Sequence, residues 1–273
     1  MTGLYGVLGD PIAQSLSPLI HRGWMRTLGL DAEYLAMQVP AGTFSDAMQT
    51  LTGRGAKGLN VTMPHKHAAS AFAATRSETV SRIGAANTLS RMEDGAWHAD
   101  NTDVPGFESD LARLGVGDLM GRPVTVIGAG GAARAVVFAL DRAGASITLL
   151  NRTLDRAVQL LSDLGIEGHK PRALDEGIPA LGSTGLVVNT ASLGHDGDSL
   201  ALPESEGGLV YDISYGPAAA RVLGPAADHG WRTADGLGML VGQAAESFRI
   251  WFGQQPDVDD ALARCRHTVD AVS

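Results

Sequence analysis

Cysteine and lysine are scarce in this sequence. Its 273 residues include one cysteine, Cys265, so no disulfide can form within the chain, and we expect a reducing compartment, the cytoplasm, as its location. Of the 21 basic residues only Lys57, Lys66 and Lys170 are lysines, and the other 18 are arginines. Because arginine keeps its proton near neutral pH, a lysine in a polar cluster is the better candidate for proton transfer.

Long apolar runs and basic clusters are also missing. No apolar stretch approaches the roughly 20 residues that a membrane-spanning helix requires, and no basic leader precedes the first apolar residues. The formal net charge is −9, without a basic run that could follow a phosphate backbone. We therefore expect neither a membrane nor a nucleic acid as a partner.

Several catalytic motifs are absent as well. His65 and His67 are two residues apart and would point to different faces of a helix, and there is no H-E-x-x-H or paired C-x-x-C motif, so we expect no metal site. The segment Thr190–Gly194 lacks the first glycine of a nucleophile elbow, and no P-loop occurs. These absences argue against a hydrolase and against a nucleotide triphosphatase.

Apolar runs alternate with helical patterns along most of the chain. Six runs are typical of strands: Leu4–Leu8, Leu59–Val61, Val124–Ile127, Ile147–Leu150, Leu186–Val188 and Leu209–Tyr211. Apolar residues spaced three and four apart predict helices at about 132–143, 157–164 and 241–252. With 44% hydrophobic and 19% charged residues, the chain is predicted to be a globular α/β protein. A helix at about 104–114 would join two domains, residues 1–102 and residues 103–235.

A glycine-rich segment follows the run Val124–Ile127. Residues 128–133 read Gly-Ala-Gly-Gly-Ala-Ala, which has the form G-x-G-x-x-A, and a predicted helix begins there. Gly128 permits a tight turn, Gly130 lets a pyrophosphate approach the backbone, and Ala133 is small enough for the helix to pack on the sheet. Although the motif alone also fits an ordinary turn, its place between a strand and a helix predicts dinucleotide binding.

The next strand ends at Asn151-Arg152-Thr153, and Arg152 follows Gly128 by 24 residues. An NAD site would place an acidic residue near this position for the ribose 2′-hydroxyl. A guanidinium can instead pair with a 2′-phosphate, and Arg156 lies one helical turn further on. The alternative is a solvated arginine at a helix start, where a cation gains nothing from the helix dipole. The sequence therefore favours NADP over NAD.

Polar residues cluster where the first domain's predicted elements end. Ser17-Pro18 fits a helix N-cap followed by proline, whereas Ser15 is not explained by a cap and would suit a substrate carboxylate. Asn60, Thr62 and Lys66 leave a strand where open α/β sheets bind ligands; the alternative is a capped helix with a surface lysine. Two further polar clusters, Asn87-Thr88 and Asp100–Asp103, are also compatible with turns.

Seven segments taken in order resemble the shikimate dehydrogenase family over about residues 4–252. They are residues 9–18 (GDPIAQSLSP), 60–66 (NVTMPHK), 86–88 (ANT), 101–103 (NTD), 128–133, 151–153 (NRT) and 235–243 (DGLGMLVGQ). The resemblance implies an enzyme of aromatic amino-acid and chorismate biosynthesis that reduces 3-dehydroshikimate to shikimate with NADPH. It also implies an N-terminal α/β substrate domain, a Rossmann-type NADP-binding domain with a parallel sheet, and C-terminal helices, within 236–273, that return to the N-terminal domain.

The family's functional positions carry over residue by residue. Lys66 and Asp103 match its catalytic pair. The matching substrate positions are Ser15, Ser17, Asn60, Thr62, Asn87, Tyr215 and Gln243. The matching cofactor positions are Glu78, Gly128, Ala129, Gly130, Gly131, Ala132, Asn151, Arg152, Thr153, Arg156, Ile213 and Gly236. Two departures are Val104-Pro105, where the family usually has a glycine after the aspartate, and Ile213, where methionine is common.

Alternatives to this interpretation remain open. One is a related enzyme that acts on quinate, or on both quinate and shikimate, with NAD; a second is a non-catalytic dinucleotide sensor, because a fold alone does not determine function. A third is a dehydrogenase of a folate-like substrate, against which Ser15 and Ser17 argue because they suit a small carboxylate. The sequence does not decide between a monomer and a homodimer.

Overall fold

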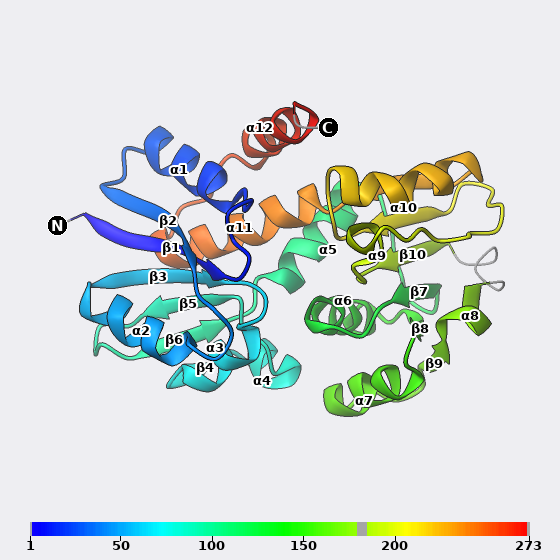
Figure 1. Cartoon of the computed structure of the whole chain (residues 1–273), viewed down its shortest axis with the longest axis horizontal. Coiled ribbons are helices and arrows are strands. Elements are labelled where there is room, and N and C mark those ends of the chain that lie inside the picture. Colours follow the sequence, from blue (N-terminus) through cyan, green and yellow to red (C-terminus); the bar gives the residue numbers. More distant parts are fainter. Residues whose placement is uncertain (1, 179–184, 272–273) are drawn as a thin grey trace. The chain divides into compact units, whose positions relative to one another are not determined.

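The computed structural model describes residues 2–178 and 185–271, which form two compact units (Figure 1). Unit 1 comprises Met1–Gly106 and Leu240–Cys265, and unit 2 comprises Phe107–Met239 and Arg266–Ser273. Three helices have residues in both units: α5 (Asp103–Arg113), α11 (Leu237–Phe252) and α12 (Val258–Asp270). The units therefore divide inside helices, after residues 106, 239 and 265.

Unit 1 contains a mixed sheet in the order β2-β1-β3-β5-β6-β4. Its strands are β1 (Gly3–Gly9), β2 (Ala32–Gln38), β3 (Ala56–Val61), β4 (Thr75–Arg76), β5 (Thr88–Arg91) and β6 (Trp97–Asp100). β1 pairs in parallel with β2 and β3, whereas β5 is antiparallel to both β3 and β6. Because β1 lies inside the sheet between β2 and β3, the chain order reverses there. In such sheets a ligand is expected at the carboxyl ends of the strands beside the reversal.

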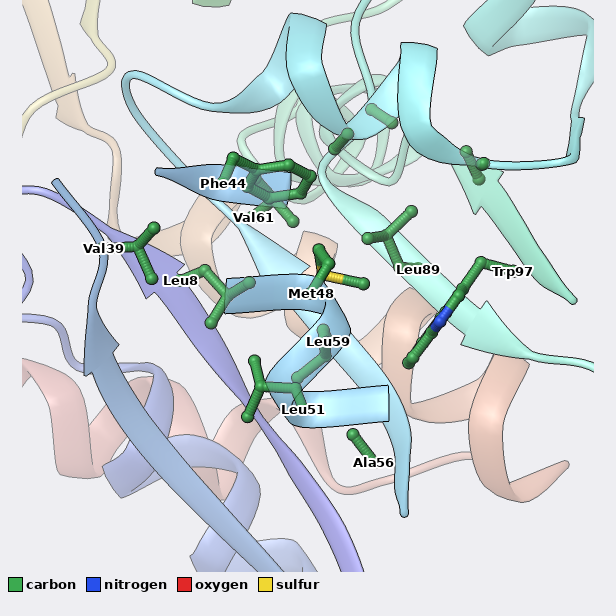
Figure 2. Packing of buried hydrophobic residues seen from close by; sticks show 14 of the residues in the cluster. Leu8, Val39, Phe44, Met48, Leu51, Ala56, Leu59, Val61, Leu89 and Trp97 are labelled. Atoms are coloured by element: carbon green, nitrogen blue, oxygen red, sulfur yellow. The ribbon is translucent and has the colours of Figure 1, made fainter. Parts of the chain in front are cut away.

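The core of unit 1 lies on both faces of this sheet. Its helices, besides parts of α5, α11 and α12, are α1 (Ser17–Thr27), α2 (Phe44–Gly53), α3 (Lys66–Phe72) and α4 (Glu78–Ile83). Met48 and Leu51 of α2 belong to one buried cluster with Leu8, Leu59 and Leu89 of the strands (Figure 2). Elsewhere, rings from α1 and α11 pack edge to face. β1 is consequently buried along nearly its whole length.

Unit 2 contains an entirely parallel sheet in the order β12-β11-β10-β7-β8-β9. Its strands are β7 (Pro123–Ile127), β8 (Ser146–Asn151), β9 (Lys170–Ala173), β10 (Leu186–Asn189), β11 (Leu209–Asp212) and β12 (Arg232–Asp235). Counted along the chain this is the order 3-2-1-4-5-6 of the Rossmann fold, read from the other edge. The expectation of a Rossmann-type parallel sheet is confirmed, and its reversal point lies between β7 and β10.

Helices join successive strands of unit 2. They are α6 (Gly131–Arg142), α7 (Leu154–Leu164), α8 (Leu174–Gly177), α9 (Leu193–Asp196) and α10 (Pro217–Asp228). The apolar stripe predicted at 132–143 is buried in α6, where Ala135, Val136 and Ala139 are each at most 2% exposed. The stripe predicted at 157–164 is likewise buried in α7. Periodicity therefore located both helices of the first βαβ unit.

Several strands of the structure are not signalled by apolar runs. β2, β9 and β12 lie at sheet edges, and in each of them exposed or half-buried residues predominate. An edge strand has one neighbour and leaves much of its surface in water, so its sequence needs few apolar residues. The glycine-containing segment 235–238 begins with the last residue of β12 and then enters α11.

Candidate functional site

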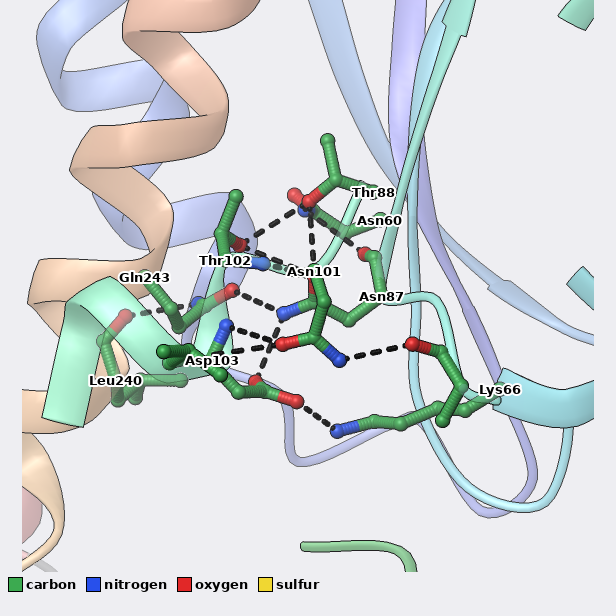
Figure 3. Close-up of polar contacts among 11 residues, drawn as sticks. Asn60, Lys66, Asn87, Thr88, Asn101, Thr102, Asp103, Leu240 and Gln243 are labelled. Carbon is green, nitrogen blue, oxygen red and sulfur yellow. Dashed lines mark hydrogen bonds and ion pairs between the residues drawn. The ribbon is translucent and has the colours of Figure 1, made fainter. Parts of the chain in front are cut away.

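Lys66 and Asp103 form a close ion pair in unit 1. Lys66 is the first residue of α3 and Asp103 the first residue of α5. The Lys66 Nζ donates to Asp103 Oδ2 over 2.6 Å, and the two side chains are 18% and 9% exposed (Figure 3). Such a short charge-assisted bond holds the ammonium in one place. An ammonium has three N–H donors, so two remain for other partners. The alternative, a capped helix with a surface lysine, does not fit, because no side chain caps α3 and Lys66 is half-buried.

The N-terminus of α5 fixes the carboxylate of this pair. Asn101 Oδ1 accepts from the backbone N–H of Asp103 over 3.1 Å, and Asn101 Nδ2 donates to the Ala85 carbonyl over 2.9 Å. A carboxylate in the first turn is also stabilised by the helix dipole. Pro105 lies in the same first turn, where its missing N–H costs the helix nothing. The departure Val104-Pro105 is thus compatible with a regular α5.

Asn87 connects the ion pair to Gln243. Its Nδ2 donates to Asp103 Oδ1 over 2.8 Å and to Gln243 Oε1 over 3.4 Å (Figure 3). Its Oδ1 accepts from the backbone N–H of Thr102 over 2.7 Å, which determines the orientation of the amide. Gln243 in turn donates to the Leu240 carbonyl over 2.8 Å. Four of the expected site residues, from α3, the segment before β5, α5 and α11, are therefore brought together by direct bonds.

Asn60 lies in β3 and extends this network inward. Its Nδ2 donates to the Asn87 carbonyl over 3.3 Å and to Thr88 Oγ1 over 3.2 Å. Its Oδ1 accepts from the hydroxyl of Tyr34 over 2.7 Å. The Asn60 amide is 4% exposed and its polar atoms all have partners within unit 1, so its position is fixed in advance.

Tyr34 is the residue of this network that sequence reasoning missed. It is fully buried in β2, and burial raises its pKa well above the usual value, which keeps its hydroxyl protonated and able to donate. It also bonds the side chain of Ser17. The available signal was an aromatic residue next to a charged one, Glu33-Tyr34, but the strand itself was not recognised.

Ser15 and Ser17, at the start of α1, do not form the expected cap. α1 begins at Ser17, its N-cap is Leu16, and no side chain caps it. The hydroxyl oxygen of Ser15 instead accepts from the Ser17 backbone N–H over 3.3 Å. The interpretation of Ser17 as N-cap is therefore wrong, because the helix starts one residue earlier than a Ser17 cap requires.

Thr62 is half-buried just beyond β3, and its N–H donates to the Leu8 carbonyl over 2.8 Å.

The glycine turn lies at the carboxyl end of β7 in unit 2. Gly128 has φ +106°, and a Cβ there would approach Thr190 Oγ1 to 2.6 Å, so glycine is required for both backbone and space. A Cβ at Gly130 or Gly131 would meet no atom within 4 Å. The N-terminus of α6, which Ala129 and Ala132 flank, therefore opens onto free space that a pyrophosphate could fill. The residues present fit a dinucleotide.

The basic residues expected at a 2′-phosphate are exposed at the end of β8. Arg152 is 71% exposed and its Nη2 lies 3.9 Å from Asp196 Oδ2. Asn151 donates to the Thr153 carbonyl over 2.8 Å, and Thr153 precedes α7, whose first turn carries the exposed Arg156. A surface ion pair at this distance contributes little. The Arg152 guanidinium is thus available to an incoming anion.

The remaining expected positions lie on two different units. Ile213 and Gly236 adjoin each other in unit 2, where the Gly236 N–H donates to the Ser214 carbonyl over 2.8 Å. Tyr215 is half-buried in the same loop, and Glu78 is exposed at the start of α4 in unit 1. The roles of Tyr215 and Glu78 stay predictions.

Neither a metal-binding cluster nor a membrane-spanning helix occurs among the described residues. Residues 2–178 and 185–271 contain no group of three or more histidine, cysteine or acidic side chains that could hold a metal ion. Within the same ranges, every helix is too short or too polar to cross a bilayer.

Comparisons with known proteins agree with this geometry. Residues 7–89 match the model of the shikimate dehydrogenase substrate-binding domain, residues 110–192 that of shikimate / quinate 5-dehydrogenase, and residues 236–266 that of the shikimate 5-dehydrogenase C-terminal domain. The NADP(+) shikimate dehydrogenase of Hyphomonas neptunium is 52% identical over 100% of both chains. The corresponding enzyme of Roseobacter denitrificans is 44% identical over 94% of this chain and 95% of the relative.

A solved structure gives the same result. Shikimate 5-dehydrogenase from Thermus thermophilus, in complex with NADP(H) and shikimate, has a TM-score of 0.85 and 35% identity, and the match covers 97% of this chain and 99% of that one. The identity, coverage and domain matches together show that this chain belongs to the shikimate dehydrogenase family.

Proposed function

We propose that this chain is an NADP-dependent oxidoreductase that interconverts 3-dehydroshikimate and shikimate. The observation that carries the proposal is the Lys66–Asp103 pair, which is bonded over 2.6 Å. Asn87 joins this pair to Gln243, and the chain belongs to the shikimate dehydrogenase family. A sensor that only bound a dinucleotide would need no such acid–base pair. Unit 1 is the proposed substrate domain and unit 2 the proposed NADP domain.

Lys66 would act as the proton donor in the reduction. NADPH, when bound, supplies the hydride that forms the new C–H bond at the C3 carbonyl carbon. One N–H of Lys66 Nζ donates its proton to the oxygen on which negative charge develops, and an O–H bond forms there. In the reverse direction neutral Lys66 accepts the hydroxyl proton. Proton transfer by a positioned side chain contributes about 10²–10⁴-fold to a rate.

Asp103 would orient Lys66. The carboxylate already receives a hydrogen bond on each oxygen, from Lys66 on Oδ2 and from Asn87 on Oδ1. These two bonds fix the carboxylate, and through it the position of Lys66 Nζ for proton transfer.

The surrounding amides and hydroxyls would recognise the substrate. Asn60, Asn87 and Gln243 are expected to bind ring hydroxyls, and Ser15, Ser17 and Thr62 the carboxylate side of the molecule. Because Asn60, Asn87 and Gln243 are at most 9% exposed and held in fixed orientations, a substrate whose hydroxyls do not match their polar atoms forms fewer hydrogen bonds there and is disfavoured.

Backbone and guanidinium groups would hold the cofactor. The N–H groups at the start of α6, from Gly130 to Ala132, suit the pyrophosphate, and Arg152 with Arg156 suits the 2′-phosphate. Ile213 and Gly236 are proposed to line the nicotinamide end. The Arg152 position supports NADP over NAD.

Location and assembly remain predictions. The single cysteine, buried as Cys265, supports a reducing compartment such as the cytoplasm. The net charge of −9 supports a small-molecule partner and argues against nucleic acid. A homodimer stays a prediction.

The test measures absorbance at 340 nm after the protein is mixed with shikimate or quinate, each with NADP⁺ or NAD⁺. We expect rapid reduction of NADP⁺ by shikimate and slow reactions in the other three mixtures. A faster reaction with quinate would reassign the substrate, since one matching family model also covers quinate enzymes. No reaction in any mixture, from folded protein, would refute the proposal.

A further inference from the structure

Asn189 and Asp212 form a buried polar pair at the carboxyl edge of the unit 2 sheet. Asn189 ends β10 and Asp212 ends β11, and the two residues face each other in the register of these neighbouring strands. Asn189 Nδ2 donates to Asp212 Oδ2 over 2.8 Å, and both residues are at most 1% exposed. A buried carboxylate is costly unless its oxygens are hydrogen-bonded, so this pair calls for an explanation.

Asn189 fixes the loop that follows β10. Its Oδ1 accepts from the Ala191 N–H over 3.2 Å, and its Nδ2 also donates to the Ala191 carbonyl over 3.3 Å. In the same loop, Thr190 donates to the Ile127 carbonyl through both its N–H and its hydroxyl, each over 2.7 Å. Thr190 packs directly against Gly128 of the glycine turn. By fixing the loop that contains Thr190, the Asn189 amide therefore helps to hold Thr190 against this turn.

Asp212 fixes the loop that follows β11. Its Oδ1 accepts from the Ser214 N–H over 2.7 Å, while the Ile213 N–H donates to the Asn189 carbonyl over 3.0 Å. The Ser214 carbonyl then accepts from Gly236. A Cβ at Gly236 would approach the Ile213 carbonyl oxygen to 2.0 Å, so these two segments are in tight contact.

Only a carboxylate next to an amide satisfies all these donors. Burial raises the pKa of Asp212, whereas the bonds from Asn189 and Ser214 and the charge of His195 lower it. Each carboxylate oxygen accepts from a different loop, and an amide at position 212 would offer one acceptor oxygen where two are used. The Asn189 amide cannot rotate to compensate, because its oxygen is engaged by the Ala191 N–H.

We propose that Asn189 and Asp212 are a positioning pair that locks the loops after β10 and β11, and through them Ile213 and the surroundings of Gly128, for the cofactor. The proposal rests on the proposed NADP-dependent function and adds two residues to it. Neither residue is expected to touch the substrate. Their effect is exerted through Ala191 and Ser214, so it should appear in cofactor affinity and turnover.

The experiment compares Asp212→Asn with the exchange variant Asn189→Asp/Asp212→Asn. In Asp212→Asn two N–H donors face each other, and we expect the Kd of NADPH, measured by fluorescence titration, to rise and kcat to fall, each by about tenfold. In the exchange variant the carboxylate at 189 can accept from both the Ala191 N–H and the amide at 212, whose oxygen can accept from Ser214, and only the 3.3 Å bond to the Ala191 carbonyl is lost. We expect it to recover most of the lost affinity and turnover.

The control is Asp110→Asn, which alters another buried carboxylate of unit 2. Asp110 accepts from the Tyr211 hydroxyl over 2.6 Å and pairs with Arg113 over 2.7 Å, and neither partner belongs to the loops after β10 and β11. We expect this variant to lower the melting temperature without changing the Kd of NADPH. If Asp212→Asn does not fold, Asn189→Ala, which removes only the amide, takes its place and should raise that Kd.

Two results would overturn the proposal. One is an unchanged NADPH Kd and kcat in Asp212→Asn or, if that variant does not fold, an unchanged Kd in Asn189→Ala. The other is an exchange variant as defective as the single variant. Because the Kd is measured without turnover, the proposal is tested even if the wild-type protein fails to oxidise shikimate, a failure that would refute only the proposed reaction.

Discussion

The two units prepare their functional groups in opposite ways. In unit 1 the residues of the polar network are largely buried and already bonded to one another. The Lys66 side chain is 18% exposed, and the other three residues, Asp103, Asn87 and Gln243, are at most 9% exposed. In unit 2, a Cβ at Gly130 or Gly131 of the glycine turn would meet no atom within 4 Å, and Arg152 is 71% exposed. Substrate recognition is thus built from side chains that are fixed before binding, and cofactor recognition from backbone groups and solvated cations.

This difference predicts different consequences of mutation. Changes in the unit 1 network should lower turnover, because a prearranged acid–base group acts on the reacting atoms. Changes on the cofactor face of unit 2 should weaken binding. Each of the following variants can break or sharpen this contrast.

The largest effect is expected for Asp103→Asn. The new amide removes the negative partner of Lys66, so we expect kcat to fall by about 10²–10³-fold while the Kd of NADPH stays unchanged. Asp100→Asn is the matched control, since this carboxylate lies three residues earlier in the chain and forms an ion pair with His98 over 3.4 Å. Steady-state kinetics that show equal losses in both variants would remove Asp103 from the mechanism.

A smaller effect is expected for Arg152→Ala. Loss of a charged hydrogen-bonding pair should raise the KM for NADP⁺ by about 10–100-fold and change the KM for NAD⁺ little. Arg142→Ala, which removes another exposed guanidinium of unit 2, serves as control. If both cofactors were weakened equally, Arg152 would not recognise the 2′-phosphate.

Substitution within the glycine turn separates binding from folding. Gly130→Ala adds a methyl group that meets no protein atom within 4 Å, so stability should be unchanged. The Kd of NADPH should nevertheless rise, by about tenfold, the equivalent of one charged hydrogen bond. Gly128→Ala should in addition lower the free energy of unfolding by about 1–3 kcal/mol, because it strains a positive φ. Identical behaviour of the two variants in calorimetry and titration would contradict this assignment.

The smallest effect on activity is expected at His21. Its ring is fully buried and stacks on Tyr34 with centroids 4.2 Å apart, and burial lowers its pKa to about 3 from 6.5. The unfolded chain binds the proton more readily than the folded chain. The free energy of unfolding should therefore decrease as the pH is lowered from 6.5 to about 3, with this residue contributing about 1.4 kcal/mol per pH unit. His21→Phe should keep wild-type turnover at neutral pH and show a correspondingly shallower acid loss in denaturant titrations. An unchanged slope would show that His21 does not titrate as described.

Much of the fold followed from local patterns in the sequence. The runs Val124–Ile127 and Ile147–Leu150 became strands, and the glycine motif between strand and helix located the turn with positive φ. These features depend on residues close together in the chain, so periodicity and backbone chemistry reveal them. Edge strands such as β2 escaped because half of their surface is polar.

The site was harder to predict because its bonds link distant residues. Lys66 and Asp103 are 37 residues apart, and Asn87 and Gln243 are 156 apart. Spacing suggested that each was a ligand candidate but could not show that they bond to one another. Tyr34 escaped because nothing near it in the sequence marks its hydroxyl as the partner of Asn60.

The most direct test of the account is the turnover of Lys66→Ala, measured at 340 nm with shikimate and NADP⁺, alongside the Kd of NADPH by fluorescence. Lys66→Arg keeps a cation that cannot exchange its proton, and Lys57→Ala removes an exposed lysine as control. The account predicts that both Lys66 variants lose about 10²–10⁴-fold in kcat with unchanged NADPH affinity, while Lys57→Ala matches the wild type. Turnover retained by Lys66→Ala would contradict it.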